Sequence, residues 1–177
     1  MKIKSNAFET AKNIELMIFD VDGVLTDGTI NIGSDGEVFK SFFCRDGLGI
    51  TIAHEAGLKL AIITGRQSKI VENRARELRI DRIWQGNLNK RAAFEDCKKF
   101  FNIDEEKICY IGDDLIDLPI MNRVALPAAV SDAVPEVKDV AQLISDFPGG
   151  HGAAREVIEF VLKSKNLWSD IVKKYLV

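Results

Sequence analysis

The stretch LMIFDVDGVLTDG, from Leu16 to Gly28, decides the fold. Its first four residues form an apolar run typical of a buried strand, which stops at Asp20; Asp22 follows, and Gly23 allows a sharp turn. Isolated carboxylates are costly to bury, so the pair indicates a bound cation, and hard oxygen ligands suit Mg²⁺. A turn at Val21 would aim the two side chains differently, one as nucleophile and the other as acid/base. The alternative is a βα turn that happens to be acidic.

Length and composition limit the classes of protein to consider. The chain has 177 residues, 46% of them hydrophobic, which is enough for one domain with a substantial core, expected to span 1–177. A net charge of −3 with both signs mixed does not favour nucleic-acid or membrane-surface binding. We find no secretory signal and no apolar run near the roughly 18 residues of a membrane span, and the three cysteines lack metal or disulfide spacing. We therefore expect a cytoplasmic protein without nucleic-acid or membrane partners.

The remaining sequence alternates strand and helix patterns. Apolar runs at 59–63 and 107–111 are of the buried parallel-strand type, and amphipathic helical patterns follow Asn89 and Gly152. A further short strand is expected at 124–126. The alternation predicts an α/β fold, an open, doubly wound parallel sheet whose site lies beyond the carboxyl ends of its strands.

Residues 29–43 interrupt this pattern with two alternating runs around a Gly-rich link, which predicts a β-hairpin. Its Phe39, Phe42 and Phe43 either pack under the hairpin on its own sheet or face another subunit, the interpretation we favour. An amphipathic tail at 164–177 is expected to dock on its own or a neighbouring subunit.

Polar residues at the ends of later elements extend the first acidic turn into a site. Thr64 and Gly65 follow a buried strand, where a hydroxyl and backbone N–H groups suit a phosphate oxygen, although Thr64 could equally cap a helix. Arg66 and Arg74 carry planar forks that suit a carboxylate. Lys90 opens a helix, where the dipole disfavours a cation. A lone lysine is usually a surface residue, but this one lies in sequence between the stretches at 62–66 and 112–117, so we assign it to phosphate and to Asp20.

Three carboxylates, Asp113, Asp114 and Asp117, follow the strand at 107–111. They would repel one another if crowded, so a metal or positive partners must offset their charge. An acidic helix N-terminus would account for Asp114 and Asp117, but not for Asp113 at a buried strand end.

Four stretches, in order, resemble the motifs of the haloacid dehalogenase superfamily of aspartate-nucleophile phosphatases, in the form without a large inserted cap. They are DVDGVLTDG at 20–28, IITGR at 62–66, Lys90 within NLNKRAAF, and GDDLID at 112–117. Within the superfamily, residues from about 13 to 160 are most similar to phosphatases of 3-deoxy-D-manno-octulosonate 8-phosphate (KDO 8-phosphate).

The resemblance implies Mg²⁺-dependent hydrolysis of a sugar-acid phosphate, in a homotetramer whose hairpin closes a neighbour's site. Asp20 is then the nucleophile and Asp22 the acid/base, with Thr64 and Lys90 holding the phosphoryl group. Metal contacts are expected from Asp20, Asp22 and Asp113. The expected substrate contacts are Asp22, Phe43, Cys44, Arg45, Asp46, Gly47, Gly65, Arg66, Arg74 and Lys90.

Single positions refine this expectation. Arg66 resembles the arginine that marks octulosonate phosphatases, where a related nonulosonate 9-phosphatase carries glutamate. Some close relatives have arginine where this chain has Thr51, so part of the contact to the substrate carboxylate is absent or supplied elsewhere. His151, in GGHGAARE, is interpreted as a loop residue. The alternatives are the same chemistry on a nine-carbon sialic-type acid phosphate, and a non-enzymatic phospho-acceptor or assembly module.

Overall fold

A computed structural model describes residues 1–4, 6–86 and 88–176, so that Val177 at the end of the expected tail lies outside the described residues. Its centre is a seven-stranded sheet in the order β1-β9-β8-β7-β2-β5-β6, and a second sheet holds β3 and β4. In the large sheet, neighbouring strands run parallel except for β1, which is antiparallel to β9. The strands are β1 (Lys2–Ile3), β2 (Leu16–Phe19), β3 (Asn31–Gly33), β4 (Gly36–Phe39), β5 (Lys59–Ile63), β6 (Arg82–Trp84), β7 (Ile108–Gly112), β8 (Leu126–Ala129) and β9 (Leu143–Ile144).

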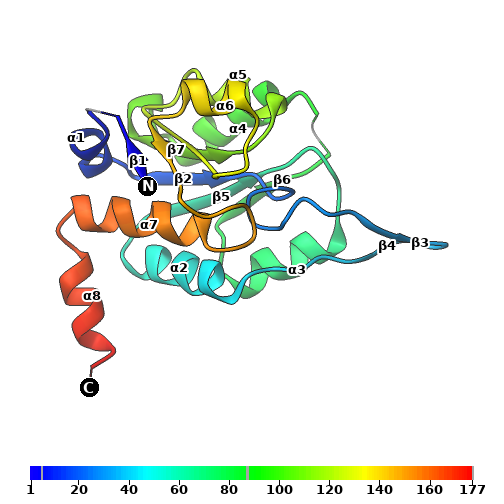
Figure 1. Cartoon of the computed structure of the whole chain (residues 1–177), viewed down its shortest axis with the longest axis horizontal. Coiled ribbons are helices and arrows are strands. Elements are labelled where there is room, and N and C mark those ends of the chain that lie inside the picture. The colour runs from blue at the N-terminus through cyan, green and yellow to red at the C-terminus, as the bar shows by residue number, and fades with distance from the viewer. Residues whose placement is uncertain (5, 87, 177) are drawn as a thin grey trace.

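Helices cover both faces of the large sheet. In Figure 1, α4, α5 and α6 lie above it, and α2, α3 and α7 lie below it. This layering confirms the doubly wound α/β prediction. The helices are α1 (Ala7–Lys12), α2 (Cys44–Glu55), α3 (Lys69–Glu77), α4 (Lys90–Phe101), α5 (Leu118–Met121), α6 (Pro135–Val140), α7 (Ala153–Ser164) and α8 (Trp168–Lys174), with short 3₁₀ turns η1 (Glu105–Lys107) and η2 (Leu115–Asp117).

Strand β2 lies at the middle of the sheet, and its four residues are all buried. It pairs in parallel with β5 on one side and β7 on the other, so that Phe19 lies opposite both Ile62 and Ile111. Since the chain runs from β2 to β5 and β6 on one side before returning to β7 on the other, the strand order reverses at β2. The carboxyl ends of β2, β5 and β7 therefore meet at the crevice where open α/β sheets bind ligands.

Two strands differ from the sequence prediction. The polar N-terminus has no strand pattern in its sequence, yet Lys2 and Ile3 form β1 against β9. The strand expected at 124–126 begins later, at Leu126, because the amides of Arg123 and Val124 still donate to the carbonyl of Ile120 in the turn that closes α5.

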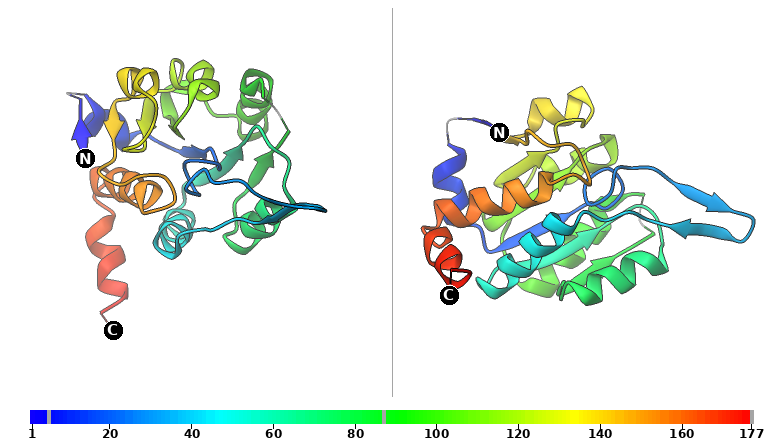
Figure 2. Two further views of the ribbon diagram at one scale, coloured as in Figure 1. Left: turned by 45° about the vertical axis from the view of Figure 1, so that its right-hand side comes forward. Right: turned by 60° about the horizontal axis from the view of Figure 1, so that its bottom comes forward.

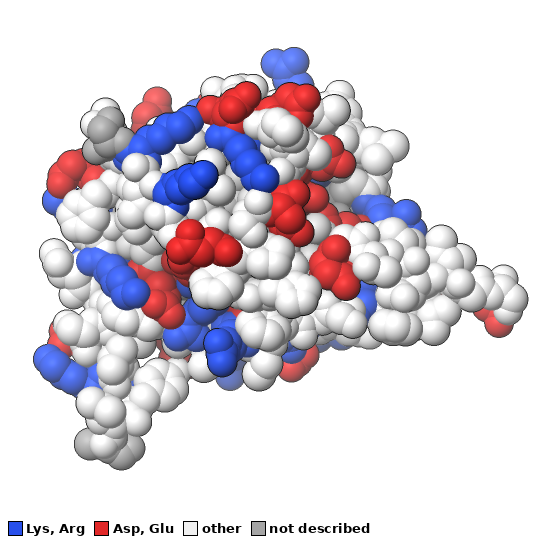
Figure 3. All heavy atoms as spheres, viewed as in Figure 1, with Lys and Arg blue, Asp and Glu red and all other residues white. Residues whose placement is uncertain are grey.

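The hairpin forms as predicted, with β3 antiparallel to β4, and it projects from the body of the protein (Figures 1 and 2). Its three aromatic residues do not share one environment. Phe39 is 52% exposed, whereas Phe42 is partly buried against the main core. Ile32 and Val38 are 69% and 59% exposed, and Figure 3 shows few charged atoms along the projecting arm. The hairpin therefore presents apolar side chains that no other described residue covers.

The C-terminal helix α8 extends away from the body (Figure 1) and contacts α7, with the Arg155 guanidinium lying 5.2 Å from the centroid of the Trp168 ring. The expected tail is thus partly docked on its own subunit. Among the described residues, no helix combines the length and apolar character needed to cross a membrane. All three cysteines are free.

Candidate active site

Asp20 directly follows the buried strand β2 and is 3% exposed. After it the chain turns tightly, since the Val21 carbonyl accepts from the amides of Val24, Leu25 and Thr26. Gly23 has φ +88°, and a Cβ there would lie 2.0 Å from a carboxylate oxygen of Asp113. Glycine is therefore required at this position, both for the backbone conformation and for the close approach of the two acidic loops.

Lys90 is fully buried and joins this turn to the loop after β7. Its ammonium lies 2.9 Å from Asp20 Oδ1 and 2.6 Å from Asp117 Oδ1. The Tyr110 hydroxyl also donates to Asp117 Oδ1, at 2.6 Å. Burial lowers the pKa of Lys90, but the charges of Asp20 and Asp117 outweigh it and raise that pKa, so the lysine stays cationic. The unusual cation at a helix start is thus explained by two buried carboxylates.

Asp117 shapes the loop that carries Asp113. Its Oδ2 accepts from the amides of Asp113, at 2.9 Å, and Asp114, at 3.3 Å. Asp114 caps the short turn η2 by accepting from the Leu115 amide at 2.7 Å. Asp117 and Asp114 therefore hold the loop, which leaves Asp113 as the acid of this motif that faces Asp20.

The acidic cluster fits a divalent cation. Ligand oxygens of Asp20, Asp113 and Asp117 lie within 4.8 Å of one another, and Oδ1 of Asp113 is buried without a hydrogen-bond partner. Burial, and then the charges of Asp20 and Asp117, raise the pKa of Asp113 to about 8. Burial also raises the pKa of Asp20, although the Lys90 charge opposes the effect. Because both oxygens of Asp117 are already bound, by Lys90, Tyr110 and two amides, Asp113 and, beside its contact with Lys90, Asp20 are better placed to hold a metal.

A cavity of about 240 Å³ opens over these acids. Asp20, Asp22, Thr64, Gly65, Arg66 and Asp113 all contribute to its lining, together with Gly28, Leu88, Asp114 and Ile116. Thr64 donates its own amide to the Trp84 carbonyl at 3.0 Å, so its contribution to a phosphate cradle is the hydroxyl. Arg66 is 49% exposed, with its Nε 3.9 Å from Asp22 Oδ2. The structure thus brings together the predicted residues from β2, β5 and β7.

The other expected substrate contacts lie elsewhere. Phe43 and Arg45 line a separate cavity of about 580 Å³ beside His151 and α7, and Cys44 and Arg74 line one of about 490 Å³. Arg74 packs over the Phe42 ring at 5.6 Å and pairs with Glu77 at 2.9 Å. A Cβ at Gly47 would lie 2.4 Å from Arg74 Nη2, so Gly47 serves this packing.

Asp46 has a structural role that the sequence did not predict. It is 2% exposed, and its two oxygens accept from the amides of Gly152, at 3.1 Å, and Arg155, at 2.7 Å. Both amides belong to the start of α7, where unpaired N–H groups need acceptors. Its carboxylate therefore anchors a helix, and its expected contact with a substrate stays a prediction. His151 fits its interpretation as a loop residue, since its Nδ1 lies 2.8 Å from the Gly149 carbonyl.

Two residues of the site were not identified from sequence. Tyr110 carries no motif of its own. Lys40 forms an ion pair with Asp22. The hairpin register could have indicated this contact, because Asn31 pairs with Phe39. Lys40, the residue after Phe39, therefore lies close to the acidic turn where the hairpin begins.

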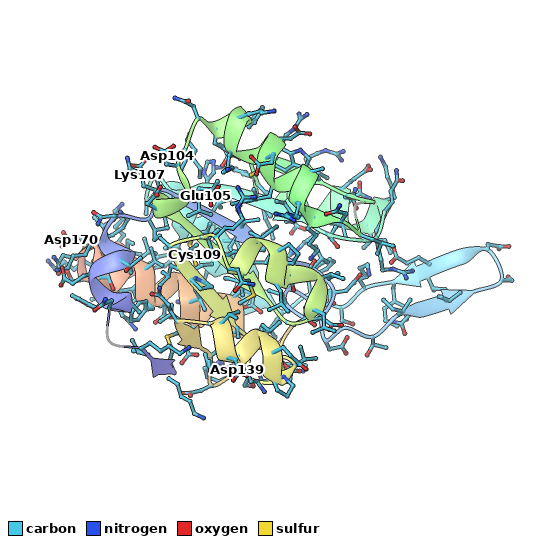
Figure 4. The ribbon with its side chains drawn as sticks, turned by 90° about the horizontal axis from the view of Figure 1, so that it is seen from above. Asp104, Glu105, Lys107, Cys109, Asp139 and Asp170 are labelled. Atoms are coloured by element: carbon cyan, nitrogen blue, oxygen red, sulfur yellow. The ribbon has the colours of Figure 1, made fainter. Side chains whose placement is uncertain are left out.

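A different cavity, of about 440 Å³, lies between α4 and η1 at the end of the molecule away from the hairpin, where Figure 4 labels Asp104 and Glu105. Within it, Glu105 pairs with Lys98 and Arg123. None of its carboxylates is buried without a hydrogen-bond partner as Asp113 Oδ1 is, which favours the smaller cavity as the site.

Comparison with known proteins agrees with this geometry. Residues 80–157 match the profile of haloacid dehalogenase-like hydrolases. The chain is 44% identical over 160 residues to the 3-deoxy-D-manno-octulosonate 8-phosphate phosphatase KdsC of Escherichia coli K12, covering 90% of this chain and 85% of the relative. The same enzyme of Yersinia pestis is 40% identical over 164 residues, covering 93% and 88%.

Solved structures extend the likeness to three dimensions. The Moraxella catarrhalis 3-deoxy-D-manno-octulosonate 8-phosphate phosphatase, in complex with magnesium, phosphate and KDO, superposes with a TM-score of 0.93 at 38% identity, covering 96% of this chain and 98% of that one. The cobalt-bound Haemophilus influenzae phosphatase gives 0.87 at 38% identity, covering 89% and 92%. The chain therefore belongs to the haloacid dehalogenase-like hydrolases, in the family of the 3-deoxy-D-manno-octulosonate 8-phosphate phosphatases.

Proposed function

We propose that the chain is a Mg²⁺-dependent phosphatase that hydrolyses KDO 8-phosphate to KDO and inorganic phosphate, a step in lipopolysaccharide precursor synthesis. The observation that carries the proposal is the buried Asp20–Lys90 pair, 2.9 Å apart, whose Asp20 lines a cavity together with Asp113, Thr64 and Arg66. Relatives of this chain bear the name of that activity, and one solved relative holds magnesium, phosphate and KDO.

In the first step, a carboxylate oxygen of Asp20 attacks phosphorus and the bond from phosphorus to the sugar oxygen breaks. Asp22 gives a proton to the departing oxygen, so that KDO leaves as an alcohol. Lys90 and the Thr64 hydroxyl hold the phosphoryl oxygens, because this chemistry depends mainly on positioning and charge stabilisation. The product is an aspartyl-phosphate.

In the second step, Asp22 takes a proton from water, and the water oxygen attacks phosphorus. The bond to the Asp20 oxygen breaks, which releases inorganic phosphate, restores the Asp20 carboxylate and leaves Asp22 protonated for the next turnover. Asp20, the backbone carbonyl of Asp22 and Asp113 would hold Mg²⁺, which when bound supplies positive charge between the acids and the phosphate.

Arg66 supports an eight-carbon sugar acid as the substrate. It lines the cavity and is half exposed, so its guanidinium is free to bind a carboxylate with both oxygens. Gly65 lies between it and Thr64, which places a carboxylate-binding group next to a phosphate-binding one.

We also propose that the protein is one domain over 1–177 and assembles as a homotetramer in the cytoplasm. A single hydrophobic cluster runs through the described residues, which supports one domain. The exposed Ile32, Val38 and Phe39 of the hairpin support a subunit interface. Three free cysteines fit a reducing compartment. Sedimentation of the wild-type protein and of Val38→Asp tests the assembly. A charge among these exposed apolar side chains of the hairpin should weaken the subunit interface and shift tetramers to smaller species.

Phosphate release with Mg²⁺ from matched eight- and nine-carbon sugar-acid phosphates and a hexose phosphate tests the function. Asp20→Asn should abolish turnover. Asp104→Asn is a matched control, because this exposed acid lies at the other end of the molecule (Figure 4). Preference for the nine-carbon acid would contradict the proposed substrate. A stable phosphoprotein without turnover would instead support a phospho-acceptor.

A further inference from the structure

Lys40 is an unusual residue for a projecting hairpin, because its side chain is only 2% exposed. Its ammonium pairs with Asp22 Oδ1 and lies 3.0 Å from Glu37 Oε1. Nearby hairpin residues such as Val38 and Phe39 are more than half exposed. Burying an ammonium is costly unless carboxylates surround it, so this contact is a specific feature of the fold.

Glu37, the second carboxylate beside the Lys40 ammonium, is itself held in place by the body of the protein. Glu37 accepts a hydrogen bond from the Ser68 hydroxyl. Ser68 is the N-cap of α3, where its oxygen accepts from the Val71 amide at 3.3 Å. The series Asp22, Lys40, Glu37, Ser68 therefore connects the acidic turn after β2, the hairpin and the body of the protein at α3.

The two oxygens of Asp22 have different surroundings. Lys40 holds Oδ1, whereas Oδ2 lies toward Arg66, at 3.9 Å from its Nε. Asp22 and Arg66 both line the cavity over Asp20. One oxygen is thus fixed and the other is presented toward the space where the leaving group must lie.

We propose that Lys40 is a positioning residue for the proton transfers of Asp22. The inference rests on the proposed function, in which Asp22 first protonates the sugar oxygen and then deprotonates water. Both transfers require Oδ2 at hydrogen-bond distance from an oxygen near phosphorus, and a side chain on a turn would otherwise sample several rotamers. Because Lys40 and Glu37 both belong to the hairpin, docking of the hairpin and orientation of Asp22 are coupled.

The test measures the first turnover in Lys40→Met by rapid quench, with two phosphates as substrates. The sugar oxygen of KDO 8-phosphate is a poor leaving group that needs the Asp22 proton, whereas p-nitrophenyl phosphate releases a stable phenolate without one. We expect first-turnover release of KDO to slow by about 10²-fold, with little change in KM, because misplacing a reacting group by about 1 Å has effects of this size. Release of nitrophenol should slow by less than about tenfold.

Matched variants separate positioning from folding. Lys40→Arg keeps the cation and should restore much of the rate. Ser68→Ala removes the contact to Glu37 together with the N-cap of α3, and should cause a smaller loss with the same substrate preference, which keeps the proposal testable if Lys40→Met does not fold. Lys69→Met is the control, since that lysine is 74% exposed and pairs only with Glu72 along its own helix.

Equal slowing with both phosphates, a rise in KM alone, or an unchanged rate would each contradict the proposal. A rise in KM alone would mean that Lys40 binds the substrate. If the wild-type enzyme hydrolyses a different sugar phosphate, the proposed substrate is wrong, and the same comparison with that phosphate still tests Lys40.

Discussion

Asp113 and Asp46 are both acids taken from sequence as site residues, and the structure treats them in opposite ways. Asp46 gives its two oxygens to backbone amides at the start of α7. Asp113 keeps Oδ1 buried without a partner, next to two further carboxylates. Burial raises the pKa of each, but amide hydrogen bonds oppose it at Asp46, whereas neighbouring charge reinforces it at Asp113. A satisfied buried acid supports the fold, while an unsatisfied one is prepared for a ligand.

The comparison extends to the regions around them. The cavity over Asp20 is built on the ends of buried strands and concentrates charge of one sign around Lys90. The region from Phe43 to Gly47 is built on a helix start and ring contacts, such as Arg45 at 5.9 Å from the Phe43 ring centroid. The following variants test whether chemistry resides in the first region and stability in the second.

The largest effect is expected for Lys90→Met, which should lower both the catalytic activity and the stability of the protein. It leaves Asp20 and Asp117 buried without their cation, so the free energy of unfolding should fall by about 3–5 kcal/mol in urea titration. The value of kcat/KM should fall by about 10²–10³-fold through lost phosphoryl stabilisation. Lys163→Met, on the exposed face of α7, should change neither; an unaltered urea midpoint in Lys90→Met would show that the buried pair is dispensable.

Next in size is the contrast between Asp113→Ala and Asp46→Ala. Asp113→Ala should lower kcat/KM by about 10²–10³-fold through loss of a metal ligand, while the metal-free protein unfolds at an equal or higher urea concentration. Asp46→Ala should lower the free energy of unfolding by about 1–3 kcal/mol, because two helix amides lose their acceptor, with kcat within a few-fold of the wild type. If Asp113→Ala and Asp46→Ala each lost both activity and stability, the distinction between a catalytic and a structural acid would not hold.

A smaller effect is the pH dependence of stabilisation by Mg²⁺. The pKa of Asp113 in the folded, metal-free protein is about 8, above its ordinary value of 3.8. Its protonated form therefore contributes stability that is complete below the ordinary pKa and is lost as pH rises through about 8. Mg²⁺ must displace that proton at low pH but meets a carboxylate at high pH. The increase in Tm on adding Mg²⁺ should thus grow from about pH 6 to about pH 9; a constant increase would contradict the shift.

The smallest effect compares two arginines. Arg66→Met should raise KM for KDO 8-phosphate by about 10–100-fold, as expected for a charge-assisted hydrogen bond to the substrate carboxylate, and should leave p-nitrophenyl phosphate unaffected. Arg74→Met should leave KM unchanged and lower the urea midpoint, because it loses the contact with Phe42. Equal rises in KM would show that Arg74 reaches the substrate in the working enzyme.

Sequence predicted the strand-end residues well because their placement follows from local pattern and sheet geometry. The apolar runs of β2, β5 and β7 are strong signals, and parallel neighbours must bring Asp20, Thr64 and Asp113 to one edge. Lys90 could be identified because it opens a helix, where a cation needs a partner, and because it lies between the second and fourth of the four motifs.

Other features depend on contacts that no local pattern carries. Asp46 accepts a hydrogen bond from Gly152, which lies 106 positions later in the sequence. The residues next to Asp46 in the sequence are equally compatible with a substrate-binding loop. The pairing of β1 with β9 involves two polar or exposed residues with no strand periodicity. Lys40 can be identified as a residue of the site only once the hairpin register is known.

The burial of two ammonium groups also affects how the protein can be handled chemically. Lys90 is inaccessible and Lys40 nearly so, whereas Lys69, Lys163 and Lys173 are more than half exposed. Amine-reactive esters attack accessible, unprotonated lysines, so they should consume the exposed set first. The protein should therefore tolerate covalent attachment to a bead or a dye through its lysines while both amines of the site remain unmodified.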